Sequence, residues 1–164
     1  MRSRCCRNWV FRPEIAVPQP IVAKPAAVPF PETPQGAHAR DVVQSHVALF
    51  RFSAVTFNGH KIHYNRDWCR EVEGHRECVV HGPLNLINIV DFWRDVVGQQ
   101  MQEGEIDGPE EELVPERIIY RATSPLYAGE MYRIILEEEK EKVMEARIVD
   151  GFGNVSMKAT IGRF

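Results

Sequence analysis

The stretch VVHGPLNLINIVDFWRDVV, residues 79–97, decides which fold this sequence predicts. Pro83 stands where the first turn of a helix would begin, and proline is tolerated there because its missing N–H would have no partner anyway. The apolar residues after it recur at helical spacing: Leu86, Ile87, Val90, Trp93 and Val97, widened by Ile89 and Phe92. We therefore expect a buried helix over residues 84–97, ended by Gly98.

Apolar segments after this helix predict strands. They cover residues 117–122, 131–136, 143–149 and 155–161. The composition of residues 150–154 is typical of a turn. The charged residues 137–142 predict a hairpin turn or a short helical overhang. Residues 99–115 are polar and acidic, and we expect a mobile loop there. One buried helix before a run of strands needs a sheet that wraps it, which is an α+β arrangement.

Polar side chains gather upstream of the helix in FNGHKIHYN, residues 57–65. The apolar residues in 47–53 predict a strand before it, with the alternation shifting once near Leu49-Phe50. Asn65 suits the N-cap of a short helix over residues 66–72, which Gly74 would stop. A strand end with polar groups, followed by a turn into the buried helix, would form a small catalytic pocket.

Residues 1–36 differ from the rest, because they hold seven of the 11 prolines. Proline at this density excludes helix and central strand, so we expect an extended or disordered arm before a domain at 37–164. The first twelve residues carry four arginines and no acidic residue, as mitochondrial targeting segments do, but serine is scarce. We expect a mitochondrial or cytoplasmic location.

Bulk composition excludes several classes of partner. The net charge of -3 gives no reason to expect nucleic acid, and no run approaches the ~18 apolar residues that a membrane span needs. Cys5 and Cys6 are adjacent, and with Cys69 and Cys78 they form no framework of spaced pairs, so we expect free thiols in a reducing compartment. His60 and His63 have no third ligand beside them, so we expect no metal site and no cofactor.

The motifs together resemble those of the MaoC-like hotdog hydratases and dehydratases. The similarity is greatest to the branch of mesaconyl-CoA hydratase and the mitochondrial type 2 hydroxyacyl-thioester dehydratases. The segments that carry it, within about residues 45–162, are 49–54, 56–64, 73–74, 79–84, 121–122 and 124–127. This resemblance implies a single hotdog fold, in which an antiparallel sheet wraps one long central helix.

The sequence also departs from the family pattern. The wider family has Gly-Asp-x-Asn-Pro-x-His, whose His falls on His63 and whose Asp falls on Asn58. The branch has a Tyr-Pro-Gly-Leu-like segment after Glu-Gly, where this chain has residues 75–78, His-Arg-Glu-Cys. Many relatives carry two hotdog halves in one chain, while this chain has room for only the second. The resemblance therefore implies a homodimer.

The implied reaction is reversible addition of water to a double bond conjugated to a thioester, carried by coenzyme A or acyl carrier protein. His63 would be the general acid and base, since its ordinary pKa near ~6.5 suits proton transfer at neutral pH. Asn58 would hold the water or the 3-hydroxyl group. The N–H of Gly82 would point at the thioester oxygen, assisted by the helix dipole.

Three further residues are candidates for substrate binding. His60 and His81 would shape the pocket or merely pack beside it. Arg121 would bind a carboxylate or the phosphates of coenzyme A, or form a surface ion pair. Two other functions remain open on this fold: an acyl-thioesterase, and a non-catalytic hotdog that binds an acyl intermediate or a protein partner.

Overall fold

The computed structural model describes residues 17–104 and 113–163. Its strands are β1 (His38–Val43), β2 (Arg117–Ala122), β3 (Met131–Leu136), β4 (Val143–Asp150) and β5 (Val155–Gly162). Its helices are α1 (His46–Val55), the 3-10 turn η1 (Lys61–His63), α2 (Arg66–Glu71) and α3 (Gly82–Gln102). The strands form one antiparallel sheet in the order β1-β3-β4-β5-β2.

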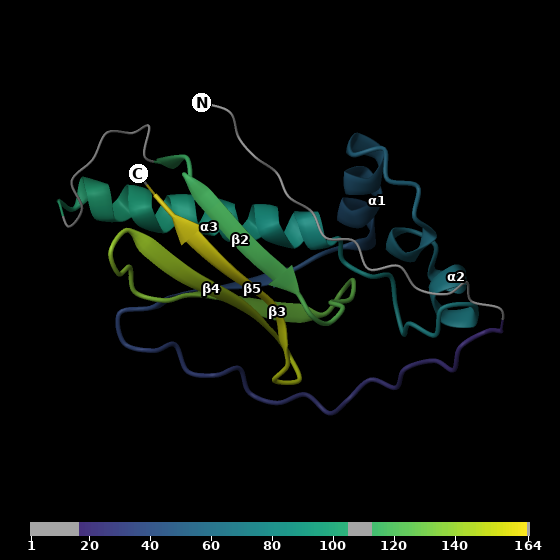
Figure 1. Cartoon of the computed structure of the whole chain (residues 1–164). Helices are drawn as coiled ribbons and strands as arrows, with labels where there is room; N and C mark the ends of the chain where they lie inside the picture. Colours follow the sequence, from purple (N-terminus) through teal and green to yellow (C-terminus); the bar gives the residue numbers. More distant parts are fainter. Residues whose placement is uncertain (1–16, 105–112, 164) are drawn as a thin grey trace.

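The core lies between α3 and one face of the sheet (Figure 1). Burial alternates along the first half of β4, because successive side chains of a strand point to opposite faces. The buried residues of α3 are Asn85, Ile89, Phe92, Trp93, Val96 and Val97. A long helix packed on an antiparallel sheet is the expected hotdog arrangement, and the prediction of an α+β fold is confirmed.

The helix α3 is longer than expected. Gly98 lies inside it rather than at its end, and Met101 in the next turn packs against the core. A glycine inside a helix costs only about 1 kcal/mol relative to alanine, so one more turn with an apolar contact can include it. The chain leaves the helix at Gly104, whose φ of 74° is easy for glycine.

The strand expected over residues 47–53 is wrong, because this segment is the helix α1. Ser45 caps it, accepting a hydrogen bond from the Ala48 N–H at 3.1 Å. Its buried residues, Leu49 and Ser53, are four positions apart, which is a helical period. The first strand is instead β1, whose sequence HARDVV has too little apolar alternation to be recognised.

The later elements agree with expectation. Asn65 caps α2 by accepting from the Trp68 N–H at 2.9 Å, and the helix lies within the predicted range. Residues 137–142 form a hairpin turn and no helix, with Glu141 and Lys142 both at positive φ. Within the expected loop at 99–115, residues 105–112 lie outside the described part.

Residues 17–37 form no helix or strand and lie against the domain (Figure 1). Backbone hydrogen bonds join Gln19 to Val72, Val22 to Gly74 and Val28 to Gly151. A Cβ added at Gly74 would come within 2.4 Å of the Pro20 carbonyl oxygen. The division of the chain at residue 36 stays a prediction. In the described residues, no helix is long and apolar enough to cross a membrane.

Candidate active site

His63 lies in the 3-10 turn after α1, and its side chain is 8% exposed. Its Nδ1 lies 2.7 Å from the Val79 carbonyl oxygen. Because a carbonyl can only accept, Nδ1 carries the proton, and the Nε2 of the neutral ring has a free lone pair. Burial lowers the pKa of His63, although the bond to Val79 opposes this. The ring is therefore a neutral proton acceptor at pH 7.

His81 stacks on His63, with 3.6 Å between the ring centroids and 18° between the planes. It occupies the N-cap position of α3, and its Nε2 lies 2.9 Å from the Ser53 hydroxyl of α1. Burial, and then the neighbouring His63, lower the pKa of His81 to about 4. The pair therefore consists of two neutral imidazoles. The helix α1 contacts this pair through its residue Ser53.

Two buried polar atoms in this region lack a partner among the described residues. They are Nδ1 of His81 and Oδ1 of Asn85, one turn into α3. Buried polar groups are nearly always hydrogen-bonded, so such orphans need an explanation. A polar ligand or a water molecule at the start of α3 would satisfy them.

Asn58 and Gly82 each adjoin a histidine of this region, Asn58 through a bond to the His60 backbone and Gly82 as the residue after His81. Asn58 Oδ1 accepts from the His60 N–H at 3.0 Å, which leaves its amide NH₂ as the group able to hold a water molecule. Gly82 is the first residue of α3, and a Cβ added there would meet nothing within 4 Å. The first N–H groups of a helix have no partner within it, so the Gly82 N–H is among the donors left over at the start of α3.

A carboxylate that the sequence analysis did not assign lies beside the histidines. Glu73 Oε1 lies 2.8 Å from the Trp68 indole nitrogen and 3.8 Å from His60 Nε2. His60 itself meets the His63 ring edge-on, with centroids 5.7 Å apart. The charge of Glu73 raises the pKa of His63, against the dominant effect of burial. Only its place in the Glu-Gly motif could have indicated it from the sequence.

The structure does not bring Arg121 into this group. It lies exposed on the edge strand β2, opposite Lys158. In the described part of the chain it forms no hydrogen bond or ion pair with the histidines. A cavity of about 320 Å³ opens instead beside Ser53 and Asn58, and its other lining residues are Phe50, Ala54, Phe57, Gly59 and Tyr64.

Comparison with known proteins identifies the family. The sequence profile of the hydroxyacyl-thioester dehydratase type 2 family matches residues 4–128. The chain belongs to this family. It is 28% identical over 151 residues to mesaconyl-C(4)-CoA hydratase of Chloroflexus aurantiacus, covering 91% of this chain and 49% of that protein. It therefore spans about half the length of this relative.

A second relative agrees with the family, and a solved structure agrees with the fold. The mitochondrial hydroxyacyl-thioester dehydratase type 2 of Schizosaccharomyces pombe is 26% identical over 130 residues, covering 79% of this chain and 37% of that protein. The (R)-hydratase of A. caviae superposes with a TM-score of 0.58 at 14% identity, covering 76% of this chain and 90% of that one. The expected MaoC-like hotdog fold is thus confirmed.

Proposed function

We propose that the chain is one hotdog half of an acyl-thioester hydro-lyase, with His63 as general acid and base. The reaction adds water reversibly to an enoyl thioester and gives the 3-hydroxyacyl thioester. The observation that carries this is the bond from Nδ1 of His63 to Val79, which leaves Nε2 of a buried neutral ring as proton acceptor. Family membership, and the names of the two curated relatives, support the reaction class.

A single base can complete the reaction. Nε2 of His63 takes a proton from water while the water oxygen attacks Cβ, and the electrons of the double bond move onto the thioester oxygen. Asn58 cannot titrate, so it only orients the water. The Gly82 N–H and the N-terminus of α3 stabilise the enolate oxygen. The imidazolium of His63 then returns its proton to Cα, which completes the addition of one H₂O.

The surrounding residues have supporting roles in this proposal. Glu73 stabilises the transient imidazolium through space, and His60 lies near both groups. His81 holds the plane of the His63 ring by stacking. Phe50, Ala54 and Phe57 give the neighbouring cavity an apolar wall suited to an acyl chain. Arg121 would bind a carboxylate or phosphate of the thioester only in an assembly in which a second subunit brings the substrate next to Arg121.

The proposed active form is a homodimer. Every residue of the edge strand β2 is exposed, including Ile118, Ile119 and Tyr120 at 36%, 51% and 41%. An exposed apolar edge strand is a surface for pairing with another chain.

We propose a mitochondrial or cytoplasmic location, which the mitochondrial relative supports in part. Residues 1–36 fused to a fluorescent protein test this directly. Mitochondrial fluorescence would select the first compartment, and diffuse fluorescence the second.

Loss of the ultraviolet enoyl absorbance tests the activity, using crotonyl-CoA, mesaconyl-CoA and a longer enoyl-CoA. We expect the wild-type chain to remove this absorbance and His63→Ala to leave it unchanged. The control variant His38→Ala, which alters a histidine of β1, should act as the wild type does. Equal turnover by His63→Ala would contradict the mechanism. Release of free coenzyme A would indicate a thioesterase, and tight binding without turnover would indicate a non-catalytic acyl-binding protein.

A further inference from the structure

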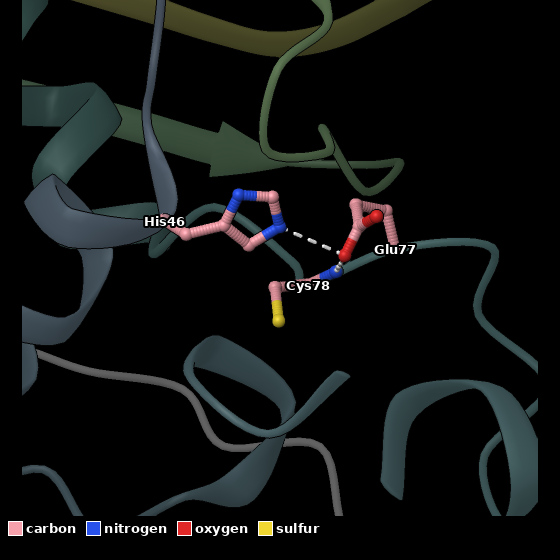
Figure 2. A group of neighbouring side chains, drawn as sticks. All are labelled: His46, Glu77 and Cys78. Carbon is pink, nitrogen blue, oxygen red and sulfur yellow. Dashed lines mark hydrogen bonds and ion pairs between the residues drawn. The ribbon is translucent and has the colours of Figure 1, made fainter. Parts of the chain in front are cut away.

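A second cluster of side chains lies outside the His63–His81 pair and has no part in the proposed reaction. It consists of His46, the first residue of α1, and of Glu77 and Cys78, from the segment between α2 and α3. Figure 2 shows the His46 ring facing the Glu77 carboxylate across their hydrogen bond, with the Cys78 side chain beside them and its sulfur turned away from the pair in this view. One nitrogen, one oxygen and one sulfur atom all lie within 4.8 Å of each other.

We propose that His46, Glu77 and Cys78 bind a Zn²⁺ ion. An imidazole, a carboxylate and a thiolate are the ligands that Zn²⁺ takes in proteins, at about 2.0–2.3 Å from the metal. His46 Nε2 and Glu77 Oε1 are already 2.9 Å apart, so small movements would place both around one ion. Three protein ligands leave the fourth tetrahedral position to a water molecule.

The carboxylate is held by neighbours in the way that bound carboxylates usually are. Arg66 Nε pairs with the other oxygen of Glu77, Oε2, at 2.9 Å, and the Cys78 N–H donates to Oε1 at 3.0 Å. Such outer partners orient metal ligands and are commonly present in real sites. Oε1 is thereby directed at His46 while Oε2 stays neutralised.

Burial of the three ligands suits entry of an ion from one side. Cys78 is 1% exposed and the Glu77 side chain 14%, whereas the His46 side chain is 53% exposed. An ion would arrive from solvent past the imidazole. Binding replaces the His46–Glu77 hydrogen bond and releases the thiol proton of Cys78 to solvent, since the thiolate is the ligand.

Two of the three ligands lie where this sequence departs from the family pattern described above. Glu77 and Cys78 fall in the His-Arg-Glu-Cys segment at 75–78, which replaces the Tyr-Pro-Gly-Leu-like segment. The third ligand, His46, is 31 positions from Glu77, so only the fold brings them together. The expectation of no metal site depended on closeness in the sequence, where His60 and His63 are the close pair of histidines and lack a third ligand beside them.

An ion here would connect two elements that build the candidate active site. Cys78 precedes Val79, whose carbonyl holds His63, and α1 carries both His46 and Ser53, the partner of His81. Zn²⁺ would join α1 to the segment between α2 and α3. We expect it to raise the thermal stability of the chain, because an ion that binds only the folded state stabilises that state.

The test is calorimetric titration of the reduced, chelator-stripped 164-residue chain with Zn²⁺. We expect one ion per chain, with His46→Ala and Cys78→Ser each binding at least about tenfold more weakly, since even outer partners cost 10–100-fold. Cobalt(II) should give a thiolate charge-transfer absorption that Cys78→Ser removes. Zn²⁺ should raise the Tm of the wild type more than that of His46→Ala.

Matched controls separate this cluster from the other histidines and thiols. His60→Ala and the Cys5→Ser, Cys6→Ser double variant should bind Zn²⁺ as the wild type does. His46 is exposed, so its variant should fold even if the buried Cys78→Ser does not. No binding by the wild type, wild-type affinity in His46→Ala, or loss of binding in either control would overturn the proposal.

Discussion

His46 and His63 both contact the segment 77–79, but their surroundings are opposite. His63 is buried, bonded to a backbone carbonyl and stacked on a second neutral ring. His46 is half exposed and bonded to the carboxylate of Glu77. The first environment disfavours the protonated form, and the second offers an anion that a cation can share. The partner and the burial of each imidazole, rather than its residue type, thus decide whether it suits proton transfer or metal binding.

The largest effect is expected from removing the buried His63. Replacing His63 by alanine removes the proposed general base, which should lower kcat about 10²–10⁴-fold while the chain still folds. Steady-state hydration rates and far-ultraviolet circular dichroism measure the two properties. Wild-type kcat in a folded His63→Ala chain would contradict the assignment.

Removing the partner of His81 should destabilise the pair that holds His63. Ser53→Ala leaves Nε2 of His81 buried without its bond, and we expect a loss of about 1–3 kcal/mol in the free energy of unfolding. Urea denaturation measures it. The double variant Ser53→Ala, His81→Phe should lose less than the sum of the single changes, because both polar partners are then absent. Strict additivity would show that the bond contributes nothing.

The charge of Glu73 should move the pH profile without abolishing activity. Burial lowers the pKa of His63 and its bond to Val79 raises it; of the described titratable side chains that change this pKa, His60 lowers it and Glu73 raises it. Glu73→Gln keeps an acceptor for Trp68 but removes the charge. The acid limb of kcat/KM, which reports protonation of His63, should therefore shift to lower pH, while Glu73→Asp should retain the wild-type limb. An unchanged or upward shift in Glu73→Gln would contradict this role.

The smallest effect is expected on the free energy of unfolding when His46 is replaced and no metal is present. His46→Ala breaks a half-exposed pair with Glu77, and exposed pairs contribute only about 0–1 kcal/mol. Urea denaturation in chelator measures the change. A metal-free loss well above this range would mean that the pair is a major structural bond.

Local patterns predicted those parts of the fold in which a side chain and its own neighbours decide the outcome. The Asn65 cap, the turn at 150–154 and the apolar strand 131–136 depend on backbone and residue type over a few positions. Segment 47–53 could not be decided in this way. A short apolar run fits a strand or a helix, and only the burial of Leu49 in the core and of Ser53 against His81 selects the helix.

The sequence by itself determined the family, the hotdog core and the placement of His63, Asn58 and Gly82 in neighbouring motifs. These depend on contiguous residues. Only the tertiary structure decided that Ser53 meets His81, that Glu73 lies beside His60, and that His46 meets Glu77 and Cys78. Each of these contacts joins a residue of segment 46–60 to a residue of segment 73–81, and only the packing of the two segments brings them together.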